Sequence, residues 1–403
     1  MRFYSYLNSA IQILDVYRVE EPFAAFLKKY FSQFTKYGSK DRKQISHLCY
    51  CFFRLGKSAP PFPPQRGRFK EGILIGLFLC SDHPNEMLEQ LKPEWNKDAD
   101  RTTEQKLLII NSSLFINNVF PWKQELSKGI DYEKFCESFF IQPDLFLRLR
   151  PGSENSVKEK LRNGEINFKE ITSSCLSLSN ASKIENIIDL DKEAVIQDYS
   201  SQQTKEYFKL TIDNCSRFAG PIVVWDCCAG SGGKSLLLYD INPNIDLTVS
   251  DIRESILINL KKRFARGGIK KYKSFVADLT SHRPPATSNY DLIICDAPCT
   301  GSGTWSRTPE QLYFFDDNLP DGQAGKIDQY ALLQKKIVSN IIPYLKENGF
   351  LVYITCSVFK KENEEVVNYI RQEFDLELKN MELLKGYDKK ADTMFVALLR
   401  KDL

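Results

Sequence analysis

Two cysteines in this chain could act as nucleophiles in one site. Cys299 lies in the segment DAPCTGSG, residues 296–303, and Cys356 lies in YITCS, residues 353–357. Each cysteine closely follows an apolar run that reads as a buried strand, so both can face the same crevice at the edge of a sheet. A thiolate is an effective covalent catalyst. Either cysteine alone is explained as well by an inert thiol, and it is the pair that indicates chemistry.

Two thiols suit a reaction on a pyrimidine ring. Carbon 5 of a pyrimidine is a poor nucleophile, but a thiolate that adds to carbon 6 converts the ring into an enamine that can take a methyl group at carbon 5. The proton on carbon 5 must then leave and the thioether must be released, so one cysteine can form the covalent bond while the other assists release. A carboxyl such as Asp296 can hydrogen-bond nitrogen 3 and the exocyclic amine of the base.

A glycine-rich turn after another buried strand indicates a cofactor site. The turn comprises Cys228, Ala229, Gly230, Ser231, Gly232, Gly233 and Lys234. Residues without Cβ let the backbone approach a ligand, and the helix that follows offers free N–H groups, which is how a doubly wound sheet holds a nucleoside. Such turns also serve tight packing alone, so further residues are needed to decide.

Three carboxylates supply that further signal, because each falls at the end of a predicted strand. Asp251 is placed where such sheets bind a ribose, Asp278 where an adenine edge would lie, and Asp296 ends the next strand. Together with the turn they predict a nucleoside crevice. A phosphate-binding GxxxxGKS loop would need glycine at position 228, where Cys228 stands, and the dinucleotide motif GxGxxG is absent. S-adenosylmethionine is therefore the leading cofactor.

The elements that must position these residues alternate between strand and helix. We predict strands at 222–226, 246–250, 272–276, 291–295 and 350–354, and the helices that separate most of them at 233–240, 253–266 and 326–345. This alternation predicts an α/β domain with a Rossmann-like parallel sheet over residues 206–403. Residues 129–205 predict a small α+β module, and 1–128 an all-α domain in which Ser39 would cap a helix.

Composition sets the limits on other functions. The net charge of +3 over 403 residues gives no overall polyelectrolyte character, and the longest apolar run, 73–80, is too short to span a bilayer. Eleven cysteines without a recognisable signal peptide or zinc-type spacing predict reduced thiols in the cytoplasm and no metal site. Cys227, Cys228 and Cys295 read as core or backbone-lining residues. We expect a monomer.

Basic residues gather in two places. Between Lys36 and Lys70 there are nine lysines or arginines and one acidic residue, interleaved with aromatics. A second cluster follows the strand predicted at 246–250 and contains Lys261, Lys262, Arg263, Arg266, Lys270, Lys271 and Lys273. Either could be an ordinary solvated face or a contact with RNA phosphates.

These motifs resemble those of the Sun-type (Fmu) family of RNA (cytosine-5-)-methyltransferases. The resemblance covers about residues 140–403 and rests on 226–234, Asp251, Asp278, 296–303, 355–357 and 362–364. Residues 1–125 resemble, more weakly, the NusB-like helical extension of rRNA-modifying members. The chain departs from the family at Gly230-Ser231, where Ala-Pro is usual, and at Thr393-Met394, where Gly-Phe is common.

The resemblance implies roles for individual residues. Cys356 would be the nucleophile, Cys299 would help release the product, and Arg148 and Arg307 would contact RNA. The expected reaction is methylation of carbon 5 of cytosine, with small-subunit (16S) rRNA as the first substrate and tRNA as the alternative. A non-catalytic RNA-binding assembly factor and a small-molecule methyltransferase also remain open. The second thiol and residues 1–205 argue against the last of these.

Overall fold

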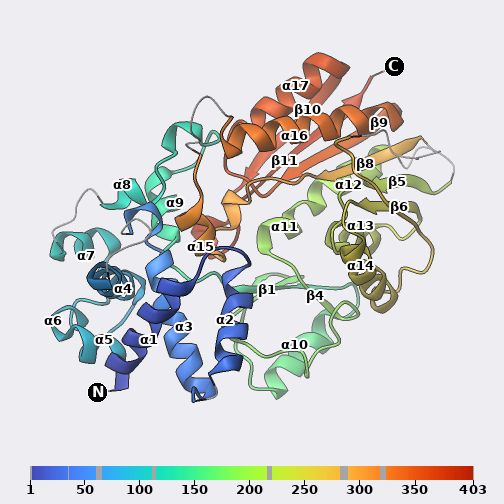
Figure 1. Ribbon diagram of the computed structural model, residues 1–403. Coiled ribbons are helices and arrows are strands. Elements are labelled where there is room, and N and C mark those ends of the chain that lie inside the picture. Colours follow the sequence, from blue (N-terminus) through green and yellow to red (C-terminus); the bar gives the residue numbers. More distant parts are fainter. Residues whose placement is uncertain are drawn as a thin grey trace. The chain divides into compact units, whose positions relative to one another are not determined.

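The computed structural model describes residues 2–34, 36–59, 66–110, 115–215, 220–281, 289–317 and 324–402, and the chain in it divides into two compact units (Figure 1). The helical unit consists of Met1–Gln124, Ile130–Gln142 and Trp305–Asp316. The sheet unit consists of Glu125–Gly129, Pro143–Thr304 and Asp317–Leu403. This division differs from the predicted three consecutive segments, because the small α+β module belongs to the sheet unit and a distant segment completes the helical unit.

Helices build the helical unit. They are α1 (Arg2–Val16), α2 (Phe23–Gln33), α3 (Ser39–Phe53), η1 (Gly56–Ser58), α4 (Arg66–Cys80), α5 (Glu86–Leu91), α6 (Pro93–Asn96), α7 (Thr103–Ile109), α8 (Phe115–Val119), η2 (Lys123–Glu125), α9 (Tyr132–Ser138) and α15 (Pro309–Phe314). The predicted cap of α3 is wrong by one residue: Gly38 is the N-cap and Asp41 accepts its N–H, so Ser39 is the first helical residue. The proline-rich segment 60–64 lies outside the described residues.

The segment 305–316 joins the core of the helical unit although it follows Cys299 in the sequence. The ring of Tyr313 on α15 lies 5.3 Å from Phe52 and 5.6 Å from Phe53 of α3, measured between centroids. Phe314 lies 5.8 Å from Tyr17. Such aromatic pairs stabilise a fold by about 0.5–1.5 kcal/mol each beyond the apolar area they bury. In Figure 1 the orange α15 lies against the blue helices of this unit.

The sheet unit contains a small and a large sheet. Its elements are β1 (Leu145–Leu149), α10 (Glu154–Asn163), β2 (Phe168–Thr172), β3 (Cys175–Leu178), β4 (Ala194–Ile196), α11 (Tyr199–Gln203), α12 (Lys205–Cys215), β5 (Ile222–Asp226), α13 (Gly233–Ile241), β6 (Ile245–Asp251), α14 (Glu254–Gly267), β7 (Lys273–Val276), β8 (Tyr290–Asp296), η3 (Ser302–Thr304), α16 (Lys326–Ile341), η4 (Ile342–Tyr344), β9 (Leu345–Thr355), α17 (Glu364–Phe374), β10 (Leu376–Leu384), η5 (Tyr387–Lys389) and β11 (Met394–Lys401).

The large sheet has a doubly wound topology. Within the described residues its seven strands lie in the order β10-β11-β9-β8-β5-β6-β7. The pairs β6–β7, β5–β6, β5–β8 and β8–β9 are parallel, whereas β11 pairs antiparallel with both β9 and β10. The strand order reverses at β5, so the carboxyl ends of β5, β6 and β8 meet at the switch point where such sheets bind ligands.

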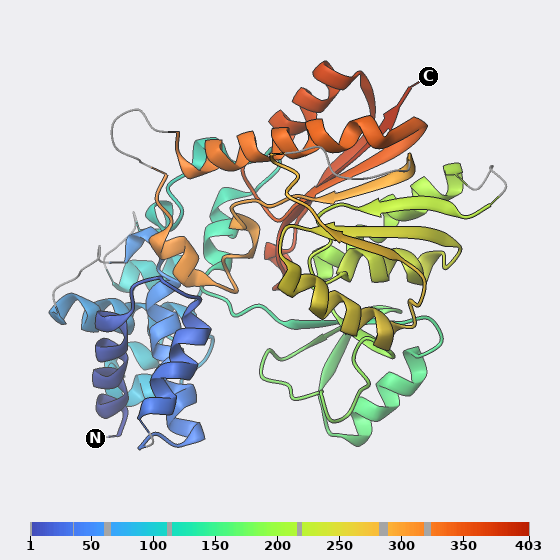
Figure 2. The ribbon, with the colours of Figure 1, turned by 45° about the vertical axis from the view of Figure 1, so that its right-hand side comes forward.

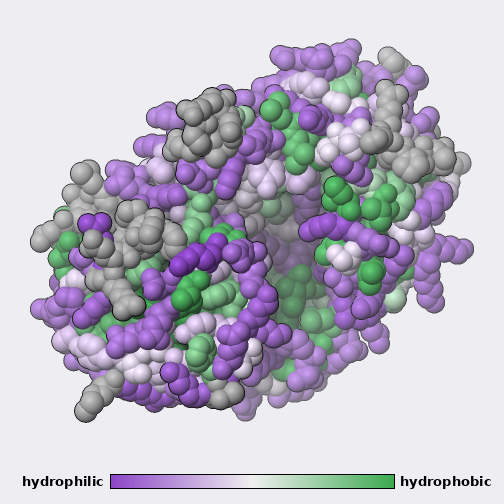
Figure 3. Space-filling model, viewed as in Figure 1, coloured by the Kyte–Doolittle hydropathy of each residue, from purple (hydrophilic) through white to green (hydrophobic). Residues whose placement is uncertain are grey.

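Helices cover both faces of this sheet. Figure 2 shows it between α16 and α17 on one side and α13 and α14 on the other. Alternate residues of the same strands feed the two cores: Val224 joins the core under α13 and α14, and its neighbour Trp225 joins the core under α16. Trp225 is fully buried, and its indole N–H donates to the Ser250 hydroxyl at 3.0 Å. The outer face of α17 is hydrophilic in Figure 3.

The small sheet is tied to the large one by buried ion pairs. Its strand order is β2-β3-β1-β4. Asp240, at the end of α13, pairs with Arg148 and with Arg150, which lies directly after β1. All three side chains are nearly inaccessible to solvent, and Gln197 accepts a further hydrogen bond from Arg148 at 2.7 Å. Breaking a buried pair of this kind costs about 3–5 kcal/mol, so this contact fixes the module.

The predicted fold class is confirmed: a Rossmann-like α/β domain follows a helical region and a small antiparallel sheet. The sequence prediction missed β10, whose residues alternate polar and apolar along an edge. None of the helices in the described part of the chain is long and apolar enough to span a bilayer.

Candidate methyl-donor and thiol site

A cavity of about 530 Å³ opens at the switch point of the large sheet. Its walls come from the turn after β5, the ends of β6, β7 and β8, and α16. The lining residues include Cys227, Cys228, Asp251, Ile252, Arg253, Ala277, Asp278, Leu279, Thr280, Asp296, Pro298, Cys299, Tyr330, Leu333 and Ile337. The structure therefore brings all three predicted carboxylates and one of the two predicted thiols to a single cavity.

The backbone conformation of the turn and its close packing both require glycine at position 232. Its φ of +82° is in the left-handed region, and a Cβ there would lie 2.5 Å from the Phe264 ring. Gly232 is also the N-cap of α13, so the first N–H groups of that helix follow it directly. Beneath the turn, burial raises the pKa of Asp226 to about 7, and a 2.6 Å hydrogen bond from Ser235 opposes this shift.

The carboxylates at the strand ends are held in place by backbone groups. Asp251, which is buried, accepts the N–H of Gly230 at 3.0 Å and the N–H of Arg253 at 2.9 Å. Asp278 is exposed and accepts the N–H of Thr280 at 2.9 Å. Apolar side chains, among them Ile252, line the same cavity. A nucleoside needs acceptors for its hydroxyls and an apolar wall for its base, and these residues supply both.

Lys234 links the turn to the thiol side of the cavity. Its ammonium donates to Asp296 Oδ2 at 3.0 Å, and the lysine side chain is 9% exposed. This ion pair fixes the direction of the Asp296 carboxylate. Asp296 is thus an oriented hydrogen-bond acceptor beside Cys299.

The two predicted thiols lie in contact. Cys299 Sγ and Cys356 Sγ are 3.2 Å apart, and both side chains are half-buried. The hydrogen bond to Cys356, together with burial, raises the pKa of Cys299 well above its ordinary value. Either sulfur can be the donor of this hydrogen bond, so the two thiols share one proton-transfer contact.

A buried carboxylate, Glu362, holds the loops that carry both thiols. It accepts the Thr300 N–H at 2.9 Å, the Thr300 hydroxyl at 2.6 Å and the Ser357 hydroxyl at 2.5 Å. Thr300 and Ser357 each directly follow one of the two cysteines. Gln334 of α16 donates a fourth bond at 3.0 Å. Burial raises the pKa of Glu362, and these hydrogen bonds oppose the shift. The sequence prediction gave Glu362 no role, although the motif at 362–364 was a signal for it.

Further backbone bonds fix the Cys356 loop. Gly303 donates its N–H to the Cys356 carbonyl at 2.9 Å and accepts the Thr393 N–H at 2.9 Å. A Cβ at Gly303 would lie 1.9 Å from the Thr393 carbonyl oxygen, so the approach requires glycine. Asn363 donates to the Ser357 carbonyl at 2.9 Å.

The structure places the two predicted RNA contacts, Arg148 and Arg307, in different environments. Arg148 is 4% exposed and paired with Asp240, so the prediction of a surface contact with RNA is corrected to an internal ion pair. Arg307 belongs to the helical unit and is half-buried, and its contact with RNA stays a prediction. In the basic cluster on α14, Arg263 and Arg266 both pair with Asp191 at 2.6 Å. These two arginines therefore also serve to join the small module to the large sheet.

Comparison with known proteins agrees with this geometry. Residues 221–399 match the family model described as 16S rRNA methyltransferase RsmB/F. This part of the chain belongs to that family. The family predicted from the motifs is thereby confirmed, and membership of a methyltransferase family implies S-adenosylmethionine as the methyl donor.

Individual relatives of the RsmB/F segment are distant. A ribosomal RNA small subunit methyltransferase B from Proteus mirabilis is 29% identical over 182 residues, which cover 44% of this chain and 41% of that protein. The chain spans less than half the length of the curated relatives it matches.

Two solved structures share the fold. The crystal structure of PH0851 has a TM-score of 0.69 at 17% identity and covers 98% of each chain. A methyltransferase homolog protein from Pyrococcus horikoshii has a TM-score of 0.53 at 23% identity, covering 74% of this chain and 98% of that one. At these identities the likeness establishes the fold.

Proposed function

We propose that this protein methylates carbon 5 of cytosine in RNA, with small-subunit (16S) rRNA as its substrate. The single observation that carries the proposal is the 3.2 Å contact of two thiols at the rim of a cavity built for a nucleoside cofactor. S-adenosylmethionine would supply an electrophilic methyl group there. The rRNA substrate is supported by the family description of residues 221–399 and by the names of the relatives.

The two thiols, whose sulfur atoms are 3.2 Å apart, would divide the reaction between them. Cys356, in the position that the family motif implies for the nucleophile, is the thiol that adds to carbon 6 of the base, and the contact with it raises the pKa of Cys299. Asp296, oriented by Lys234, hydrogen-bonds the Watson–Crick edge and stabilises the charge that develops on the ring during addition. The C6–S bond forms as the C5–C6 double bond opens, and carbon 5 becomes nucleophilic.

Cys299 acts in the second half of the reaction. Once the Cys356 sulfur is a thioether, its hydrogen bond with Cys299, the first cause of the raised pKa of Cys299, is weakened. Cys299 can then transfer its own proton to water and, as a thiolate, accept the proton of carbon 5. The electron pair left on carbon 5 re-forms the double bond, and the C6–S bond breaks to return the Cys356 thiolate.

Two substitutions test these roles with separate readouts. Cys356→Ala should abolish transfer of a radiolabelled methyl group to small-subunit rRNA. Cys299→Ala should stop release, so that a covalent RNA–protein species persists on a denaturing gel. Cys175→Ala, which removes a buried thiol of the small sheet, is the matched control and should keep activity. Methylation by Cys356→Ala would refute the nucleophile, and free RNA with Cys299→Ala would refute the release role.

The substrate itself is tested on RNA from cells with and without the protein. Bisulfite sequencing should show one or more cytosines of small-subunit rRNA that lose protection when the gene is deleted. Loss of protection in tRNA alone would leave the chemistry intact and overturn the rRNA assignment.

A further inference from the structure

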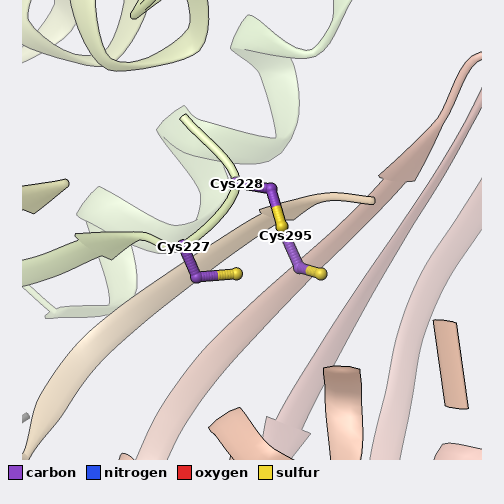
Figure 4. A group of neighbouring side chains, drawn as sticks. All are labelled: Cys227, Cys228 and Cys295. Carbon is purple, nitrogen blue, oxygen red and sulfur yellow. The ribbon is translucent and has the colours of Figure 1, made fainter. Parts of the chain in front are cut away.

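Three more thiols converge beside the donor cavity. Figure 4 shows Cys227, Cys228 and Cys295 as neighbours, with the sulfur of Cys228 directed between the other two side chains. The three Sγ atoms all lie within 4.8 Å of one another, and across the described ranges no other three His, Cys, Asp or Glu side chains gather their ligand atoms so closely. Cys227 and Cys295 are buried and Cys228 is half-buried. We call these residues the three-thiol group.

Strand register explains the convergence. Asp226 of β5 is paired with Ile294 of β8, and Cys227 continues the ladder by donating its N–H to the Ile294 carbonyl at 2.9 Å. Cys227 and Cys295 therefore occupy matching positions on neighbouring parallel strands and point to the same face. The chain then turns sharply, so that Cys228 packs against the same core as the other two instead of the opposite one.

We propose that the three-thiol group is a binding site for a thiophilic divalent metal ion such as Zn²⁺. Zinc binds thiolate sulfur at about 2.3 Å, which puts the sulfurs of a three-thiolate site about 3.8–4.0 Å apart. The observed spacing, with every pair inside 4.8 Å, reaches that geometry through small rotations of the side chains. Binding would release the three thiol protons and form three metal–sulfur bonds.

The burial of the three thiols favours a divalent over a monovalent ion. A divalent ion with three thiolates leaves one net negative charge, whereas a monovalent ion such as Cu⁺ leaves two, and buried charge is costly. Soft sulfur ligands also exclude the hard ions Mg²⁺ and Ca²⁺. Because Cys228 and Cys227 line the donor cavity, a bound ion would tie the end of β5 and the glycine turn to β8.

The test measures metal content, so it is independent of methylation. The full chain is reduced, dialysed against Zn²⁺ and analysed for metal, and Cd²⁺ is titrated while the ultraviolet charge-transfer band of cadmium thiolates is followed. We expect one ion per chain. Cys295→Ser should weaken binding at least about tenfold, and Cys228→Ser, in the half-exposed turn, should do the same where Cys295→Ser fails to fold. Cys175→Ser is the control.

The competing thiols are removed in a second arm. The double variant Cys299→Ser/Cys356→Ser lacks the other close sulfur pair, and the proposal requires that it still binds one ion with unchanged affinity. Loss of binding in the double variant would move the ion to the two-thiol pair and overturn the proposal. So would unchanged binding in both Cys295→Ser and Cys228→Ser, or absence of bound metal in the reduced wild type.

Discussion

Replacing Glu362 by glutamine should slow methylation without removing any group that touches the substrate. The carboxylate accepts hydrogen bonds from Thr300 and Ser357, the residues that follow the two cysteines, and from Gln334. An amide of the same shape keeps one acceptor oxygen and places an NH₂ group where the other was. The hydroxyl donors can rotate, but the backbone N–H of Thr300 is fixed in its direction.

The size of the effect follows from the bonds lost. Hydrogen bonds to a charged group contribute about 1.5–3 kcal/mol each, and a buried donor left without a partner costs about 1–3 kcal/mol. We assume that one such bond is lost and that half to all of its energy is needed to bring the thiols back to their reactive positions. The activation free energy of methyl transfer then rises by about 1–3 kcal/mol. That range corresponds to a decrease in kcat of about five- to 150-fold.

The assay is single-turnover methyl transfer with saturating donor and RNA, which isolates the chemical step. Glu365→Gln, an exposed carboxylate on α17, is the matched control and should leave the rate unchanged. The affinity for donor should also stay unchanged in Glu362→Gln, because Glu362 does not line the cavity. A wild-type rate for Glu362→Gln would refute the positioning role, and an equal loss in both variants would assign the effect to general charge.

The pH dependence of stability gives a second readout for the same residue. Burial raises the pKa of Glu362 above its ordinary value of 4.5, so the folded state takes up this proton at higher pH than the unfolded state. The free energy of unfolding of the wild type, compared with that of Glu362→Gln, should therefore increase as the pH falls through the raised pKa and level off below 4.5. Urea unfolding at a series of pH values would show it, and an opposite slope would contradict the direction of the shift.

Three further substitutions have defined outcomes. Asp240→Ala leaves two buried arginines without their partner and should lower the free energy of unfolding by about 3–5 kcal/mol in urea titrations; a change under 1 kcal/mol would contradict the pairing. Gly303→Ala forces a methyl group against the Thr393 carbonyl and should cost about 1–3 kcal/mol and slow methylation. Asp251→Asn should weaken S-adenosylmethionine binding about tenfold or more by calorimetry, since it removes a fixed acceptor held by Gly230; unchanged affinity would remove Asp251 from the cofactor site.

The sequence predicted best those parts of the site that depend on short, contiguous motifs. Apolar runs followed by acids located β5, β6 and β8, since a buried parallel strand needs a continuous apolar stretch and its end faces the ligand. The glycine turn was recognisable because glycine adopts the left-handed backbone found at Gly232 without the strain that other residues incur. The same reasoning placed Cys299 and Cys356 at one edge.

Local sequence patterns could not predict contacts between residues that lie far apart in the chain. The family resemblance implied an RNA contact for Arg148, and only the fold brings Asp240 to it from 92 positions away. The three-thiol group was hidden for the same reason. Cys228 follows Cys227 directly, which in an ideal strand would send their side chains to opposite faces, and the register with Cys295 is a property of the sheet.

The interleaving of the two units has a consequence for biosynthesis. Aromatic rings of α15 complete the core around α3, yet α15 ends only at Phe314. During translation the first 124 residues are therefore synthesised before α15, and the apolar surface that α15 covers stays exposed to solvent while most of the sheet unit leaves the ribosome. A fragment cut after residue 142 would lack that final helix, and a fragment starting at residue 143 would carry it with nothing to bury it. We therefore expect neither fragment to fold into a stable, soluble protein when it is expressed alone.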